Sequence, residues 1–332
     1  DSRFSTVLMH VWSQNIILGG QDSQGKDATN LLTHVCLNAT QKLHMTNPTI
    51  SVRFFRGSPF ALLERSCQVL RDGYGMPVVF NDEVIIPALR KLGIPLEEAR
   101  DYSNDGCWQT LIPGKTEFRY TLINAPRCLE RALNRGYSRI TGEREGIESG
   151  NPYTFSSFQE IMDAFRSQLD YETKRVMDTM ANHYGCLYDI APVPFLSSLI
   201  EGCSKEGKDI TEGGAKYAIH GMLLMGLSTV ADSLAAIKKL VIEDKAISWV
   251  ELLKGLENNF LEREDLRQTL ITRAPKYGTD SDYVDELAEE TLDYFVQRVE
   301  YHDGNYGNKK LKFSTGAGSV ETYVVAGECV GA

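Results

Sequence analysis

The 332-residue sequence lacks the features that mark several common classes of protein. No apolar run is long enough to span a bilayer, and the N-terminal letters D-S-R-F-S-T do not form a secretory signal. The formal net charge is -10 and no block of basic residues occurs, which argues against nucleic acid as the main partner. We therefore expect a cytoplasmic protein that binds neither membranes nor nucleic acid.

Cysteine and histidine are few and scattered. Seven cysteines, an odd number at wide spacing, do not form a disulfide framework and fit a reducing cytosol. The six histidines have no metal-ligand spacing, and no P-loop, G-x-G-x-x-G or H-E-x-x-H is present, so we assign no metal. Cys107 follows the short polar run Y-S-N-D-G, and an isolated cysteine of this kind is more often an inert packing residue than a reactive one.

Both ends of the sequence differ from those of most free domains. The N-terminal residues pass at once into the apolar run V-W-S-Q-N-I-I-L-G-G, and the sequence stops in the strand-like run Y-V-V-A-G-E-C-V-G-A. Chain termini are usually polar and poorly ordered. We therefore expect that the chain is a piece of a longer polypeptide.

The pattern of apolar residues predicts one mixed α/β unit, with strands early and helices dominant later. The expected strands are 14–20, 49–55, 78–80, 310–314 and 319–327. The expected helices are 28–43 with Asp27 as N-cap, 58–71, 83–92 capped by Asn81 and Asp82, 155–182, 194–203, 215–240, 248–257, 262–273 and 281–301. The run 215–240 is apolar on most faces, so we interpret it as a buried helix.

Several segments, taken together and in order, carry a specific resemblance. They are N-I-I-L-G-G-Q-D-S-Q-G-K-D-A-T-N (15–30), N-P-T-I-S-V-R (47–53), D-G-Y-G-M-P-V-V-F-N-D (72–82), L-E-E-A-R-D-Y-S-N-D-G-C (96–107), P-F-L-S-S-L-I-E-G-C (194–203), G-K-D-I-T-E-G-G-A-K-Y (207–217), A-D-S-L-A-A-I-K-K-L-V (231–241), A-P-K-Y-G-T-D (274–280) and V-V-A-G-E-C-V-G-A (324–332). The sequence resembles the central part of a glycyl radical enzyme, the superfamily of pyruvate formate-lyase and the glycerol- and choline-type lyases. The resemblance covers nearly all of residues 1–332 as one partial pyruvate formate-lyase-like barrel domain.

The resemblance implies a fold and a chemistry. The fold is of the α/β class, a ten-stranded barrel wrapped by helices, here truncated at both ends. The chemistry begins with a radical on a backbone glycine, installed by a radical-SAM activating enzyme that uses S-adenosylmethionine and an iron–sulfur cluster. A loop cysteine passes its hydrogen atom to that glycine, and the resulting thiyl radical takes a hydrogen atom from a small polar substrate. Cys107 occupies the position of this cysteine.

The candidate site comprises Cys107 as the catalytic residue and Gln109, Trp108 and Arg53 as substrate-binding residues. Gln109 stands where dehydratase and lyase branches usually carry glutamate, within G-C-V-E, and glutamine is not a useful base. Trp108 either lines the pocket or packs in the barrel wall. Arg53 lies on the expected strand 49–55 and either holds an anionic substrate or forms a structural ion pair.

Three hypotheses for function remain open. The leading one is an anaerobic lyase or dehydratase that cleaves a C–O, C–N, C–S or C–C bond. The glycyl radical motif, R-V-x-G-Y or similar, and the N-terminal region of the family do not occur in this sequence, so the chain alone would be inactive. The second hypothesis is a formate C-acetyltransferase, although that mechanism uses two adjacent cysteines and Cys107 is followed by Trp108. The third is a non-catalytic barrel fragment or subunit, and a homodimer is left open.

Overall fold

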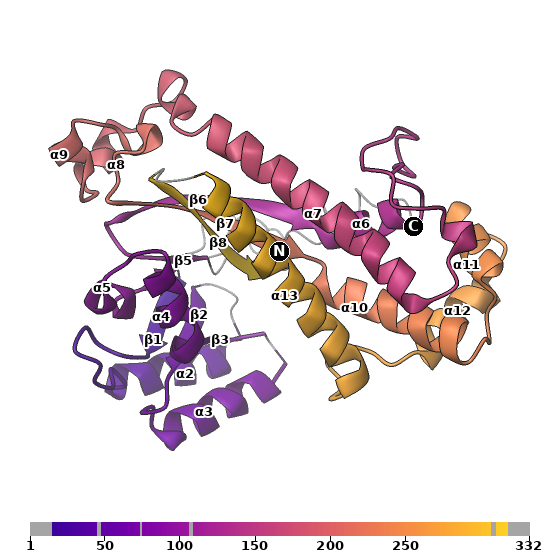
Figure 1. Ribbon diagram of the computed structural model, residues 1–332. Coiled ribbons are helices and arrows are strands. Elements are labelled where there is room, and N and C mark those ends of the chain that lie inside the picture. The colour runs from indigo at the N-terminus through magenta and orange to yellow at the C-terminus, as the bar shows by residue number, and fades with distance from the viewer. Residues whose placement is uncertain (1–14, 45–47, 74, 106–108, 307–309, 318–332) are drawn as a thin grey trace, which may run out of the picture. The chain divides into compact units, whose positions relative to one another are not determined.

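The computed structural model of the chain (Figure 1) describes residues 15–44, 48–73, 75–105, 109–306 and 310–317. These residues belong to two compact units. The first unit takes in the chain up to residue 118 with 193–210 and 214–217, and the second takes in 119–192, 211–213 and the chain from residue 218 onward. Within the described ranges, no helix is both long and apolar enough to cross a membrane. The single barrel domain over 1–332 stays a prediction.

The first unit is built on a parallel sheet with strand order β1-β2-β3. The strands are β1 (Asn15–Gly19), β2 (Thr49–Phe54) and β3 (Val78–Asn81). Helices α2 (Leu31–Leu43) and α3 (Phe60–Arg71) connect them, since parallel neighbours need a long crossover. Strands and helices share a core that comprises Leu18, Leu37, Ile50, Val52, Leu62 and Val69.

Helix α2 begins later than the sequence predicts. Its N-cap is Asn30, whose side-chain oxygen accepts hydrogen bonds from the backbone amides of Leu32 (2.9 Å) and Thr33 (3.3 Å). Asp27 instead accepts hydrogen bonds from the amide and the hydroxyl of Thr29 in the preceding turn. Aspartate and asparagine are equally good caps, so the sequence alone does not decide between them.

The remaining elements of the first unit are short. They are α4 (Asp82–Lys91), α5 (Leu96–Arg100), β4 (Ser103–Asn104), β5 (Thr110–Leu111), α8 (Pro194–Ser198) and α9 (Cys203–Glu206). Asn81 alone caps α4, by accepting a hydrogen bond from the Glu83 amide at 3.0 Å. The single helix expected over 194–203 is interrupted: α8 ends at Ser198, and Gly202, with a φ of 104° that only glycine adopts readily, precedes α9.

The second unit contains most of a sheet with strand order β6-β7-β8. The strands are β6 (Thr116–Asn124), β7 (Tyr217–Met225) and β8 (Leu311–Ala317). Strands β7 and β8 are parallel, with Ala218 opposite Leu311 and Leu224 opposite Ala317. Strand β8 agrees with the predicted strand 310–314, and the predicted strand 319–327 lies outside the described residues.

Helices supply most of the second unit. The two longest, α7 (Phe158–Asn182) and α13 (Asp282–Asn305), lie side by side (Figure 1). The other elements are α6 (Ala125–Ala132), α10 (Leu227–Ala236), α11 (Trp249–Glu257), α12 (Glu264–Arg273), a π-helix η4 (Ile237–Glu243) that continues α10, and short 3-10 turns η1 (Pro152–Thr154), η2 (Cys186–Asp189) and η3 (Ile210–Glu212). Phe165 and Phe295 are fully buried in the common core.

The prediction of one buried helix over 215–240 is wrong. The structure has strand β7, a turn at Gly226 with a φ of 79°, and then helix α10. Every residue of β7 after Tyr217 is buried, so the strand shows no alternation of apolar and polar residues. A continuous apolar run does not distinguish a buried strand from a buried helix. Strand β6 was also not predicted.

Candidate functional site

A short hairpin in the first unit flanks the Cys107 loop. Strands β4 and β5 are antiparallel, with Ser103 opposite Leu111. Beyond them, the Asp105 amide donates to the Gln109 carbonyl at 3.0 Å, and the Gln109 amide donates to Asp105 Oδ1 at 2.7 Å. These two bonds join Asp105 to Gln109, the described residues on either side of 106–108. Cys107 and Trp108 themselves lie outside the described residues.

The hairpin is attached to the parallel sheet through Asn104. Its side-chain amide donates to Ser51 Oγ at 3.2 Å, and its carbonyl accepts from Asn15 Nδ2 at 3.1 Å. Asn15 Oδ1 in turn accepts hydrogen bonds from the hydroxyls of Thr49 (3.0 Å) and Ser51 (3.2 Å). Amide and hydroxyl groups from β1 and β2 therefore hold the strand that leads into the loop.

Gln109 follows the loop directly and is only 6% exposed. Two hydrogen bonds to Asp105 fix the backbone of Gln109, which lies two residues after Cys107 in the sequence. A glutamine amide donates and accepts hydrogen bonds but takes up no proton near neutral pH. Its role in substrate binding stays a prediction.

Arg53 on β2 is buried and bound by a carboxylate. Its Nε and Nη2 donate to Oδ1 and Oδ2 of Asp82, each at 2.9 Å. This is the structural ion pair that the sequence analysis gave as one alternative, and substrate binding by Arg53 stays a prediction. The expectation that Asp82 caps α4 is wrong, because Asn81 is the cap and the Asp82 side chain binds Arg53.

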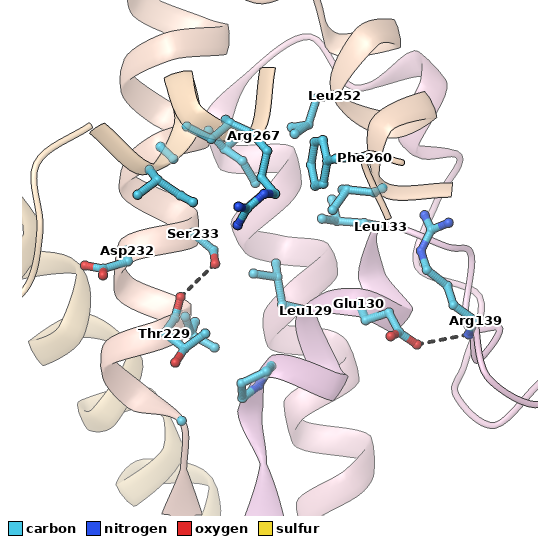
Figure 2. A pocket seen from close by; sticks show the side chains of 18 of the residues that line it. Leu129, Glu130, Leu133, Arg139, Thr229, Asp232, Ser233, Leu252, Phe260 and Arg267 are labelled. Atoms are coloured by element: carbon cyan, nitrogen blue, oxygen red, sulfur yellow. Dashed lines mark hydrogen bonds between the residues drawn. The ribbon is translucent and has the colours of Figure 1, made fainter. Parts of the chain in front are cut away.

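A separate cavity of about 480 Å³ lies in the second unit between α6, α10, α11 and α12 (Figure 2). Its wall is mostly apolar, with Leu129, Leu252 and Phe260 among the lining residues. Charges of both signs lie at its edge, where the Arg139 amide donates to Glu130 at 3.0 Å. The described lining residues include no cysteine and no histidine, so we place the candidate site at the hairpin.

Two other titratable side chains of the described residues, His220 and Cys128, are buried in the core of the second unit. No group of three or more histidine, cysteine, aspartate or glutamate side chains in these ranges is placed to hold a metal ion. His220 on β7 is buried, its Nε2 lies 2.8 Å from the Thr121 hydroxyl, and burial lowers the pKa of its imidazole to about 4. Cys128 in α6 is fully buried, and burial raises the pKa of its thiol to about 12.

Reasoning from the sequence missed four residues of this site, namely Asn15, Asn104, Asp105 and Tyr102, whose hydroxyl donates to Asp82 Oδ1 at 2.7 Å. A signal for the hairpin was present, because N-D-G at 104–106 is a typical turn sequence. No local signal marks Asn15 or Tyr102, since their contacts come from segments far away in the chain.

Comparison with known proteins gives one family and several relatives. A family model described as pyruvate formate lyase-like matches residues 8–327. The (2S)-3-sulfopropanediol dehydratase of Klebsiella oxytoca is 34% identical over 318 residues, which cover 95% of this chain and 38% of that protein. The chain therefore spans about two fifths of the length of the curated relatives that it matches.

Two solved structures are also similar. One, from work on 1,2-propanediol dehydration in Roseburia inulinivorans, is 38% identical with a TM-score of 0.79, and the match covers 96% of this chain and 41% of that one. The other is hydroxyproline dehydratase from Clostridioides difficile with trans-4-hydroxy-L-proline bound. It is 31% identical with a TM-score of 0.82, and the match covers 96% of this chain and 40% of that one.

Proposed function

Because the chain belongs to the pyruvate formate lyase-like family, within the glycyl radical enzyme superfamily, we propose that it is the cysteine-bearing part of a lyase or dehydratase. The α/β barrel class predicted from the sequence is the fold of the matched structures. The printed names of two relatives, a sulfopropanediol dehydratase and a hydroxyproline dehydratase, both describe loss of water from a hydroxylated small molecule. We therefore propose a small polar substrate that carries a hydroxyl or another leaving group.

One observation carries this proposal: a short hairpin, β4 and β5, holds the described residues on both sides of Cys107 in the sequence. Two hydrogen bonds join Asp105 to Gln109, and Asn104 attaches the first strand of the hairpin to β1 and β2. A reacting group must be held within a fraction of an ångström of its partner for efficient transfer. A cysteine between residues held in this way suits repeated hydrogen-atom transfer better than one on a long, unsupported loop.

In the proposed reaction four hydrogen-atom transfers surround the breakage of one substrate bond. Cys107 gives its thiol hydrogen to the glycine radical, which an activating enzyme has installed with S-adenosylmethionine and an iron–sulfur cluster. The Cys107 thiyl takes hydrogen from a substrate C–H bond, which restores the thiol and leaves a carbon radical. The neighbouring bond to the leaving group then breaks. The product radical recovers hydrogen from the thiol, and the thiyl recovers its own from the glycine.

Proton transfer sets the role of Gln109 in this proposal. When a hydroxyl leaves as water, it takes up a proton, and in a diol the hydroxyl that stays on the radical carbon loses one. Gln109 binds such groups through its amide but does not take up the proton. The proton then passes to the leaving group or to another residue of the pocket. We propose that Trp108 and Gln109 contact the substrate.

The experiment uses the complete polypeptide that contains this chain, purified without oxygen and treated with its activating enzyme. We expect a glycyl radical by electron paramagnetic resonance and turnover of a substrate in a panel that includes glycerol, 1,2-propanediol, trans-4-hydroxy-L-proline and isethionate. Cys107→Ala keeps the radical and lowers turnover by at least about a thousandfold. Cys128→Ala is the matched control, since Cys128 is a fully buried cysteine in α6 of the second unit.

Other outcomes decide between the alternatives. Turnover that survives in Cys107→Ala contradicts the proposal. Acyl transfer that depends on coenzyme A would show the formate C-acetyltransferase instead. If the polypeptide accepts no radical and turns over no substrate, the remaining hypothesis is that the chain belongs to a non-catalytic subunit.

A further inference from the structure

Arg53 connects the parallel sheet of the first unit to the segment that precedes the Cys107 loop. Its Nη1 donates to the carbonyl of Tyr102 at 3.0 Å, and its Nη2 donates to the carbonyl of Arg100 at 2.8 Å. The guanidinium carbon also lies 3.8 Å from the centre of the Tyr102 ring. One side chain on β2 therefore holds two main-chain carbonyls and an aromatic ring of residues 100–102.

Asp82 fixes the guanidinium of Arg53 in this orientation. Its two carboxylate oxygens accept from Nε and Nη2 at 2.9 Å, and Oδ1 also accepts from the Tyr102 hydroxyl at 2.7 Å. The backbone amide of Gln21 adds a further bond to Oδ2 at 3.2 Å. The Asp82 side chain is 0% exposed and that of Arg53 is 6% exposed, so the pair is shielded from water. A planar fork of donors is needed to meet a carboxylate and two carbonyls at once.

The cluster of Arg53, Asp82 and Tyr102 lies next to the hairpin along the chain. Tyr102 is followed by Ser103 and Asn104 of β4 and then by Asp105, whose side chain accepts from the Gln109 amide. The hairpin is thus held at its entry by the charged cluster and one step later by the amides and hydroxyls around Asn104. Movement of Tyr102 would be passed directly to the hairpin, because Tyr102 is followed at once by Ser103 and Asn104 of β4.

We propose that Arg53, Asp82 and Tyr102 are positioning residues that hold the hairpin of β4 and β5 and act through it on hydrogen-atom transfer at Cys107. This inference rests on the proposed function, since the position of the sulfur matters for rate only if the sulfur exchanges hydrogen atoms. In this role Arg53 acts through the hairpin and does not touch the substrate. A displacement of about 1 Å in a reacting group lowers a rate by about a hundredfold.

The test replaces Arg53 by lysine in the complete, activated enzyme. Lysine keeps the positive charge beside Asp82 but lacks the fork that reaches both carbonyls. We expect Arg53→Lys to lower kcat per glycyl radical by about tenfold to a hundredfold with KM unchanged within about twofold. Tyr102→Phe keeps the ring and removes one hydrogen bond to Asp82, so we expect a smaller loss of kcat.

A second readout does not depend on catalysis. Amide hydrogen exchange of the peptide that contains Asp105 and Gln109 reports how often the hairpin opens. We expect exchange there to be at least about tenfold faster in Arg53→Lys than in the unaltered protein. Faster exchange without any activity in the unaltered enzyme would refute the proposed function and leave the anchoring of the hairpin established.

The matched control is Arg131→Lys. Arg131 is 3% exposed and binds Glu145 at 2.7 Å and Glu172 at 3.2 Å, but it lies in α6 of the second unit. We expect this variant to lose stability while kcat per radical and exchange in the hairpin stay unchanged. Equal losses of kcat per radical in both lysine variants would overturn positioning. A large rise in KM in Arg53→Lys would also overturn it, in favour of direct substrate binding by Arg53.

Discussion

Acid should destabilise the second unit through His220. This imidazole is 4% exposed, lies 2.8 Å from the Thr121 hydroxyl and packs at a tilt against the Phe313 ring, with the ring centres 5.8 Å apart. Burial, with a smaller contribution from the charge of Arg119, lowers its pKa from 6.5 to about 4. The folded protein therefore keeps His220 neutral over a range in which the unfolded chain already binds a proton.

The sign and size of the effect follow from this difference. Between pH 6.5 and about 4 the unfolded state binds more protons at this residue, so stability falls as the pH falls through that window. Between pH 7.5 and 4.5 the loss from His220 is about 2.5 kcal/mol, since each pKa unit corresponds to about 1.4 kcal/mol. This is a large part of the stability of an ordinary domain.

Urea unfolding at both pH values measures the loss. In His220→Gln the amide still reaches the Thr121 hydroxyl but does not titrate, and all other groups are unchanged. The variant should therefore lose about 2 kcal/mol less than the unaltered protein on acidification. Equal losses within about 0.5 kcal/mol would refute the idea that His220 is held neutral in the fold.

Two further substitutions test the core and the start of the long helix α7, by urea unfolding at neutral pH. Phe165→Ala removes a ring that is 0% exposed and should cost about 3–5 kcal/mol, and a cost below about 1 kcal/mol would contradict the packing. Ser157→Ala removes the N-cap side chain that accepts a hydrogen bond from the Glu160 amide, and it should lower the free energy of unfolding by about 1 kcal/mol. The control is Ser167→Ala in the same helix, which should change the free energy of unfolding by less than half of that.

Strands β1, β2 and β3 and helices α3 and α4 of the first unit were predictable because strong chain breakers delimit them. Asn47-Pro48 precedes β2 and Gly93 follows α4, and each interrupts the apolar pattern where an element ends. Strand β7 was mistaken for a helix because it is buried on both faces and has no periodicity. The boundary between β7 and α10 depends on the left-handed backbone of a single glycine, Gly226. In the sequence this glycine stands within an apolar run and does not by itself indicate a boundary.

The candidate site was predictable in one respect only. The polar run before Cys107 and the family resemblance identify the loop, and the turn sequence at 104–106 indicates the hairpin that flanks it. The partner of Arg53 was not predictable. Asp82 lies 29 residues away and its sequence position favours a helix cap, whereas the fold brings its carboxylate to the guanidinium of Arg53. Contacts of this kind depend on how strands and helices pack, and no local pattern encodes them.

The π-helix η4, which continues α10 over Ile237–Glu243, has a consequence for how the family tolerates changes in length. Its hydrogen bonds span five residues where those of an α-helix span four, so the segment holds about one residue more than a regular helix between the same two ends. Removal of one residue there would restore the α-helical ladder without displacing α10 or the segment after Asp244. Natural single-residue gaps among relatives should therefore concentrate between 237 and 243, and a deletion engineered at this place should be accepted where one in α7 is not.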